Sequence, residues 1–397
     1  MDTQLTDDKG FTVSAIKTSN SSLISICLLP KEEAILAWEE WKRNATKDNS
    51  KIESKIIPFV YLRLSNFGLK DEWLDRFAKV QQMTWAHNQL LLNEVQPVLE
   101  RLNKLNIPLI LLKGAAMSLH YASNLGYRYF KDIDLLIPKE RMLESEQEIL
   151  NTGWTTDLKK IAWIKNKSNL EEWHKTSHSA HFINANKQIL DLHWFTTYCW
   201  CKDSFQKQFW DRAVKINYQG IPLNVLSPTD AFFNICLHGI TQNQKEEKYW
   251  LIDIFNIIEK HKINWDLLSK LARESETKLP MSKAIEELEN FNIIEAPNWI
   301  KEDLETRSYS LIENSDHFIE KNGANTIIGG LPCYISDYLR SEISSTGKSH
   351  LFQFYKFIKL KWHINSPLSL IKVIIKKIAK KWVMQLLRFC RSSKNPH

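Results

Sequence analysis

Two carboxylates at the head of an apolar segment limit what this chain can fold into more than any other feature. Asp132 and Asp134 open the run 132–137, whose four remaining residues are leucine or isoleucine. Because side chains alternate between the faces of a strand, both carboxylates would point one way, and Ile133 and Leu135 would point into the body. Adjacent like charges are unfavourable without a compensating cation, and a pair of divalent metal ions would compensate them. The segment therefore predicts a strand that carries metal-binding carboxylates.

The composition is ordinary for a globular protein and sets only broad limits. With 397 residues, 43% hydrophobic and 25% charged, the chain is long enough for two or three domains. Its 11 glycines argue against an all-β fold rich in tight turns. The six cysteines are scattered, the first residues are polar and acidic, unlike a secretory signal, and the apolar stretch 22–29 is too short to span a bilayer. We therefore expect a cytoplasmic protein.

Hydrophobic periodicity divides the chain into a helical part, an α/β part and a second helical part. Helical spacing covers about residues 31–106 and includes Leu36 and Trp85 among its apolar positions. Helical spacing returns after Ser227, which resembles a helix N-cap followed by proline. We therefore predict an α+β protein in which a small mixed-sheet core is flanked by N-terminal and C-terminal helical regions. The expected boundaries are 1–105, 106–226 and 227–397.

The central part combines short apolar runs, which are typical of buried strands, with segments of helical spacing. Strands are expected at 108–112, 132–137, 180–184 and 188–194, with a small hairpin in 214–225. Helices are expected at 115–121 and 139–150.

A third carboxylate and a glycine turn fit the same kind of site. Asp191 lies in an apolar strand, where a charge is costly unless it is paired or bound to a metal. On a strand close to Asp132 and Asp134, it would complete a set of three carboxylates able to hold two magnesium ions. Lys113-Gly114 ends the first strand at a helix N-terminus, where glycine allows close approach to a phosphate and free N–H groups attract anions.

These segments resemble the uncharacterised nucleotidyltransferase family, which belongs to the DNA polymerase β-like nucleotidyltransferase superfamily. The motifs that carry the resemblance are, in chain order, Leu111-Leu112-Lys113-Gly114-Ala115-Ala116, Arg128, Asp132-Ile133-Asp134-Leu135-Leu136-Ile137, Asp191-Leu192-His193-Trp194, His238 and Trp250-Leu251-Ile252-Asp253. The resemblance spans roughly residues 30–300, and the combination of Lys-Gly, Arg and Asp-x-Asp is fairly specific.

The resemblance implies a fold, a reaction and a set of site residues. It implies a nucleotidyltransferase core that moves a nucleoside monophosphate from an NTP, expected to be ATP, to an acceptor hydroxyl or phosphate by a two-metal mechanism. The implied metal ligands and catalytic residues are Asp132, Asp134 and Asp191, with Mg²⁺ or Mn²⁺ as the cofactor. The implied nucleotide-binding residues are Lys113, Gly114, Ala115 and Arg128.

Several of these residues also fit ordinary structural roles. The wider superfamily has glycine or serine after the turn glycine, whereas this chain has Ala115, so a hydroxyl contact to phosphate is absent. Lys113 fits a solvated turn residue equally well. Arg128 suits phosphate because its planar fork donates two hydrogen bonds, but it also suits a surface arginine that pairs with a carboxylate. His238 and Asp253 either line the site or serve packing and capping.

The histidines near the predicted strands also allow alternatives. His174, His178 and His181 have a spacing that one helix face would turn into a zinc site, but the strand expected there breaks the helical geometry. His193 follows Asp191 by two residues and shares its strand face. It would orient a carboxylate, act as a base or form structural hydrogen bonds.

The net charge of +7 is modest, and much of it lies near the C-terminus. There, lysines and arginines alternate with apolar residues in the pattern of a basic amphipathic helix, which suits an anionic membrane surface, a partner or packing on the body. A small metabolite or biosynthetic intermediate is the expected acceptor. The alternatives are a toxin-like enzyme that modifies RNA or protein, with nucleic acid not favoured, and a non-catalytic nucleotide-sensing or membrane-associated scaffold.

Overall fold

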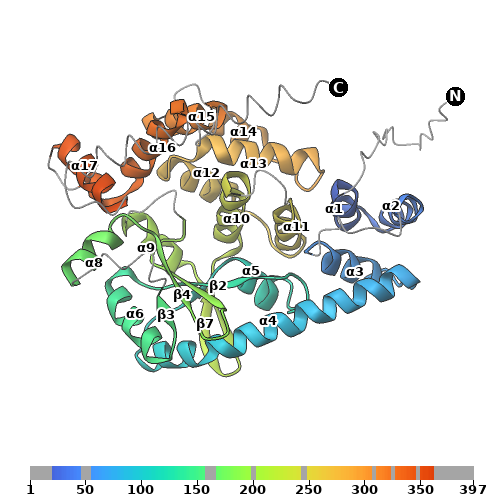
Figure 1. Cartoon of the computed structure of the whole chain (residues 1–397). Helices are drawn as coiled ribbons and strands as arrows, with labels where there is room; N and C mark the ends of the chain where they lie inside the picture. Colours follow the sequence, from blue (N-terminus) through green and yellow to red (C-terminus); the bar gives the residue numbers. More distant parts are fainter. Residues whose placement is uncertain are drawn as a thin grey trace, which may run out of the picture.

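A computed structural model describes eight stretches of the chain, and these enclose one mixed sheet among many helices (Figure 1). The described stretches are 20–45, 55–156, 167–197, 203–242, 248–305, 310–322, 327–345 and 349–361. The basic amphipathic helix expected near the C-terminus lies outside the described residues. None of the helices in these stretches is long and apolar enough to cross a bilayer.

Seven strands form a single sheet in the order β3-β4-β5-β2-β1-β7-β6. They are β1 (Ile110–Leu111), β2 (Asp132–Leu136), β3 (Thr155–Thr156), β4 (Ser179–Ile183), β5 (Ile189–His193), β6 (Val214–Tyr218) and β7 (Ile221–Val225). The pairs β2–β5 and β1–β7 are parallel, and the other neighbouring pairs are antiparallel. The predicted strands and the hairpin are therefore present, whereas the short edge strand β3 was not predicted. With helices around it, this mixed sheet confirms the predicted α+β class.

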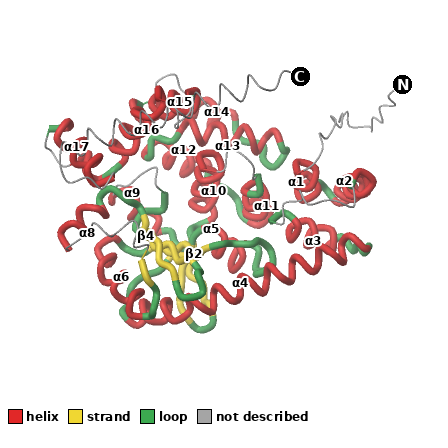
Figure 2. The backbone as a smooth tube through the Cα atoms, viewed as in Figure 1, coloured by secondary structure: helices red, strands yellow, loops and turns green. Residues whose placement is uncertain are grey.

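Helices pack on both faces of the sheet, and Figure 2 shows the strands gathered between them. Ile133 and Leu135 of β2 point to one face, where they pack in a core with the second half of α4 (Glu72–Lys104). Leu136 points to the other face and joins a second core, shared with α10 (Pro228–Gln242) and α11 (Trp250–Lys260). The predicted alternation along β2 is confirmed, and it places Asp134 on the face of α10 and α11.

The N-terminal helices are α1 (Asn20–Leu28), α2 (Lys31–Asn44), α3 (Ile57–Asn66) and α4. Asp71 caps α4 by accepting a hydrogen bond from the Leu74 N–H, at 2.9 Å, and it also accepts one from the Trp38 indole N–H, at 2.8 Å. Two positions of the predicted apolar stripe are wrong, since Leu36 is 69% exposed and Trp85 is 49% exposed. Both residues fit helical spacing but lie on faces that nothing covers within the described residues.

The remaining helices fall into a set around the strands and a set that follows later in the chain, and the gold and orange helices of the later set form the upper part of Figure 1. Around the strands lie α5 (Lys113–Ala116), a π-helical turn η1 (Met117–Tyr121), a 3₁₀ turn η2 (Lys139–Arg141), α6 (Met142–Asn151), α8 (Lys167–His174) and α9 (Asp203–Asp211). After α10 and α11 come α12 (Trp265–Glu274), α13 (Lys278–Asn290), α14 (Asn298–Leu304), α15 (Leu311–Asn322), α16 (Ile327–Arg340), a 3₁₀ turn η3 (Glu342–Ser345) and α17 (His350–Lys361).

The start of α10 confirms the predicted N-cap. The Ser227 hydroxyl donates to the Asp230 carboxylate at 2.6 Å and accepts from the Asp230 N–H at 3.4 Å. Helices α1 to α3 and α10 to α14 share one apolar core that also covers the sheet. The two helical regions expected on either side of the α/β part therefore pack against each other as well as on the sheet.

Candidate active site

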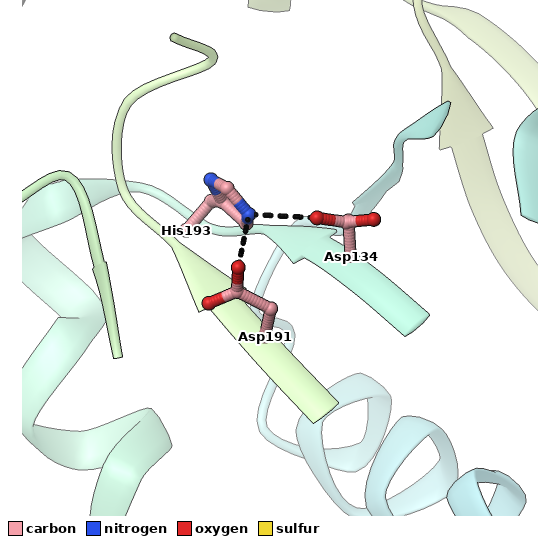
Figure 3. Close-up of side chains that lie close together, drawn as sticks. All are labelled: Asp134, Asp191 and His193. Atoms are coloured by element: carbon pink, nitrogen blue, oxygen red, sulfur yellow. Dashed lines mark hydrogen bonds and ion pairs between the residues drawn. The ribbon is translucent and has the colours of Figure 1, made fainter. Parts of the chain in front are cut away.

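Adjacent parallel strands bring two of the predicted carboxylates together (Figure 3). Asp134 on β2 lies directly opposite Asp191 on β5, and His193 follows on the same face of β5. The His193 Nε2 atom lies 3.0 Å from Asp134 Oδ1 and 3.0 Å from Asp191 Oδ2. All three residues are buried, and their ligand atoms lie within 4.8 Å of one another. They form a compact group of donors of the kind that binds a metal ion.

Asp132 lies beside this group without being part of it. It is half-buried at the start of β2, two residues before Asp134, and its register partner on β5 is Ile189. Burial and then the negative charge of Asp134 raise the pKa of the Asp132 carboxyl. Asp132 therefore interacts electrostatically with the group, but the third residue of the group is His193.

Positive charges balance the two buried carboxylates. The Lys113 Nζ atom lies 2.5 Å from Asp134 Oδ1. Burial alone would raise the pKa of the Asp134 carboxyl, but Lys113 and His193 outweigh it and hold that pKa below its usual value. Burial would lower the pKa of His193, but the Asp191 charge and the hydrogen bonds to both carboxylates raise it to about 9. At neutral pH the group therefore contains a lysine and an imidazolium facing two carboxylates.

Asp191 keeps one oxygen without a hydrogen-bond partner. Its Oδ1 atom is buried, and within the described residues no donor satisfies it. His181, directly opposite on β4, forms an ion pair with this oxygen, with 3.5 Å between its Nδ1 atom and Asp191 Oδ1. A buried carboxylate oxygen without a hydrogen bond is unusual in a folded protein and marks a position that another ligand would fill.

The turn from β1 into α5 is held by packing. Lys113 has φ of 46°, in the left-handed region that non-glycine residues rarely adopt. A Cβ atom on Gly114 would lie 2.7 Å from the Phe130 Cβ, so glycine is required for the turn to pack against the segment that leads into β2. Ala115 is 1% exposed and belongs to the sheet core. Lys113 is therefore a partner of Asp134 in the site, and Gly114 is needed because of its contact with Phe130.

Half-buried Arg128 and buried Asp253 form an ion pair that the sequence did not reveal. The Arg128 guanidinium donates from Nη1 to Asp253 Oδ2 on α11, and its Cζ atom lies 4.7 Å from the centre of the Tyr249 ring. Burial raises the pKa of the Asp253 carboxyl to about 6, although Arg128 opposes this shift. The alternative of an ion pair for Arg128 holds, but the partner is a buried residue 125 positions along the chain.

The other histidines divide between structural and site positions. His174 is buried and pairs with Glu146, with 2.8 Å between Nε2 and Oε1. The His178 ring centre lies 5.4 Å from that of His193, and His181 faces Asp191. The three therefore do not form one metal face, as the strand at β4 led us to expect.

Comparisons with known proteins add a family and a distant structural likeness. The profile of the family described as uncharacterised nucleotidyltransferase matches residues 51–289, more than half of the chain. The solution structure of the antibiotic-resistance factor ANT(2″)-Ia is similar with a TM-score of 0.34 and 13% identity, over 52% of this chain and 99% of that chain. Its crystal structure in complex with adenylyl-2″-tobramycin gives a TM-score of 0.34 and 13% identity, over 49% of this chain and 98% of that chain. Among curated proteins, none matches the sequence.

Proposed function

Because this chain belongs to the uncharacterised nucleotidyltransferase family, we propose that it transfers a nucleoside monophosphate from an NTP to an acceptor hydroxyl or phosphate. The observation that carries the proposal is the placement of Asp134 and Asp191 on adjacent parallel strands, with Lys113 beside them. In the reaction, an acceptor oxygen bonds to the α-phosphorus, the bond from that phosphorus to the bridging oxygen breaks, and pyrophosphate leaves. Asp191 orients a hydroxyl acceptor and takes its proton.

The donor set suits a divalent cation. Asp134, Asp191 and the neighbouring Asp132 would hold Mg²⁺ or Mn²⁺ through carboxylate oxygens, which these ions prefer. The Asp191 Oδ1 atom, which has the His181 ion pair but no hydrogen bond among the described residues, supports this assignment, because a bound cation would satisfy it. When bound, the ions would neutralise negative charge on the triphosphate and lower the pKa of the acceptor hydroxyl. His193, as an imidazolium beside Asp134 and Asp191, would add positive charge to the site and would not be a metal ligand.

The same proposal gives the remaining residues their roles. Lys113 and Arg128 bind the triphosphate, with ATP as the expected NTP, because both are cations close to the carboxylates. The turn at Gly114 and Ala115 supplies backbone N–H groups toward the phosphates. A small metabolite or biosynthetic intermediate is the proposed acceptor, and catalysis consists mainly of positioning and charge stabilisation.

The decisive experiment follows a label from the nucleotide. The protein is incubated with each α-³²P-labelled NTP, with Mg²⁺ or Mn²⁺, and with fractionated cell extract, and the labelled product is separated and counted. We expect labelling by the wild type and a loss of at least about 100-fold in Asp134→Asn and in Asp191→Asn. Asp266→Asn, an exposed carboxylate on α12, is the control and is expected to label normally. Labelling that persists in both site variants would refute the proposal.

Metal binding gives a second measurement that does not depend on the acceptor. Mn²⁺ binding is followed by electron paramagnetic resonance with the wild type and with Asp134→Asn. Loss of one carboxylate is expected to weaken Mn²⁺ binding by about tenfold or more. Equal Mn²⁺ affinity in the two proteins would show that Asp134 is not part of the metal site.

A further inference from the structure

The Arg128–Asp253 pair differs from another ion pair in the same protein, in which a half-buried arginine binds a buried carboxylate through two hydrogen bonds. Arg212 binds Asp230 through two parallel hydrogen bonds of 2.9 and 2.7 Å, and Ser227 adds a third to that carboxylate. Arg128 gives Asp253 one hydrogen bond from Nη1. Among the described residues, the buried Arg128 Nε and Asp253 Oδ1 atoms then have no partner. A pair that served stability alone would hydrogen-bond these atoms, so the missing hydrogen bonds indicate a different role.

The backbone around Arg128 is held without Asp253. The Asn88 side chain on α4 donates to the carbonyl oxygens of Leu125, at 2.7 Å, and of Arg128, at 2.6 Å. The Tyr127 hydroxyl donates to the Ile252 carbonyl at 3.2 Å and accepts from Asn256 at 2.5 Å. These bonds fix the loop to α4 and α11. The contact with Asp253 therefore determines where the Arg128 guanidinium lies, and does not determine the path of the chain.

The guanidinium lies on the side of the sheet that carries the carboxylates. The Arg128 side chain is 16% exposed, its Cζ atom is 4.7 Å from the centre of the Tyr249 ring, and its charge interacts with that of Asp134. Asp253 thus holds one N–H end of the guanidinium, and the Tyr249 ring covers one of its flat faces. The remaining N–H donors of this side chain are the ones left for an anion.

We propose that Asp253 is a positioning residue that holds the Arg128 guanidinium in the orientation in which its remaining donors bind the triphosphate of the NTP. The inference rests on the proposed function, because it gives Arg128 a nucleotide to bind. Asp253 contacts neither nucleotide nor metal and acts through Arg128. Since Asp253 lies on α11, this contact makes the helical region after the sheet part of the nucleotide site.

A double-mutant cycle tests the proposal through binding rather than turnover. Affinity for α,β-methylene-ATP with Mg²⁺ is measured by calorimetry for the wild type, Arg128→Ala, Asp253→Asn and the double variant. Each single variant is expected to bind about 10- to 100-fold more weakly. In the Arg128→Ala background, Asp253→Asn is expected to have no further effect. Asp230→Asn, which removes the buried carboxylate that pairs with Arg212, is the matched control and is expected to change affinity less than twofold.

The outcomes separate this inference from the proposed function. If the wild type binds no NTP analogue with Mg²⁺ or Mn²⁺, both fail. If the wild type binds but Asp253→Asn binds equally well, or weakens binding equally with and without Arg128, only the positioning role fails. Circular dichroism checks the fold of each variant. Should Asp253→Asn not fold, Asp253→Glu keeps the charge but moves the carboxylate, and unchanged affinity in that folded variant would overturn the proposal.

Discussion

His193 shows at the scale of one residue how the site balances its charges. Its Nε2 atom lies between two buried carboxylates, each at 3.0 Å, on the face of the sheet that α10 and α11 cover. Two carboxylates this close repel each other unless a cation lies between them. The imidazolium supplies that charge in the protein alone, and a divalent ion would supply it in the complex. The His193 imidazolium and a bound metal ion would therefore both reduce the repulsion between the two carboxylates.

Removing this imidazolium is expected to make the fold depend on metal. In His193→Gln, the free energy of unfolding without metal should fall by about 3 kcal/mol, because the carboxylates lose a buried partner. Saturating Mg²⁺ should then raise the melting temperature of His193→Gln more than that of the wild type. The measurement is thermal unfolding with and without Mg²⁺. His174→Gln, which breaks the buried pair with Glu146, controls for the loss of any buried histidine. An equal Mg²⁺ effect in wild type and His193→Gln would contradict the prediction.

His238 on α10 is expected to make stability fall at acid pH. Burial and then the positive charge of Lys113 lower its pKa to about 4 in the folded protein, against about 6.5 when unfolded. The folded state therefore binds this proton less readily, so stability that is present above pH 6.5 is lost as the pH falls toward 4. When the pH falls from 7.5 to 5, the free energy of unfolding should decrease by about 2 kcal/mol more in the wild type than in His238→Gln. Urea unfolding at each pH measures this difference. Parallel pH profiles for the two proteins would show that His238 does not carry this effect.

At the scale of elements, the pattern of side chains along each strand was predictable and the neighbours of each strand were not. The alternation of β2 follows from Ile133 and Leu135, and the strand at β5 follows from the apolar residues around Asp191. The parallel pairing of β2 with β5 is a long-range contact, so the role of His193 as a partner of Asp134 was not evident from its spacing alone.

There are physical reasons why some features of the structure could not be predicted from the sequence. The edge strand β3 has two residues, too few to show a period. The Arg128–Asp253 pair joins residues 125 positions apart, and neither residue has a local pattern that marks the other. The family resemblance seen in the motifs is confirmed by the match over residues 51–289, whereas the roles of the individual site residues stay predictions.

The contact between α10 and α11 leads to a prediction at Gly239. A Cβ atom at this position would lie 2.5 Å from the Cγ and Cδ2 atoms of Trp250, which are in the part of the indole ring next to the Trp250 Cβ. Gly239→Ala should therefore push the helices apart and lower the free energy of unfolding by about 1–3 kcal/mol, although alanine favours the helix by about 1 kcal/mol. Urea unfolding measures this, and Trp250→Leu in the same chain should restore part of the loss. A more stable Gly239→Ala protein would contradict the predicted contact.

At the scale of the whole molecule, helix α4 links two cores. Leu74 and Phe77 in its first half pack in the core shared by the N-terminal and C-terminal helices. Leu92 and Leu99 in its second half pack in the core on the opposite face of the sheet. The sheet therefore depends on helices from both sides of it in the sequence, and the site on its surface depends on α10 and α11.

This arrangement predicts how fragments of the chain behave. Fragment 106–226 contains the seven strands but lacks α4 on one face and α10 with α11 on the other, so both apolar faces would be exposed. Because burying that surface is the main favourable term in folding, we expect no cooperative urea transition by circular dichroism. Fragment 70–226 regains α4 and should show partial structure with strong binding of the dye ANS to its uncovered face. The full chain should unfold cooperatively and bind little dye, and cooperative unfolding of 106–226 would show that the sheet is an independent domain.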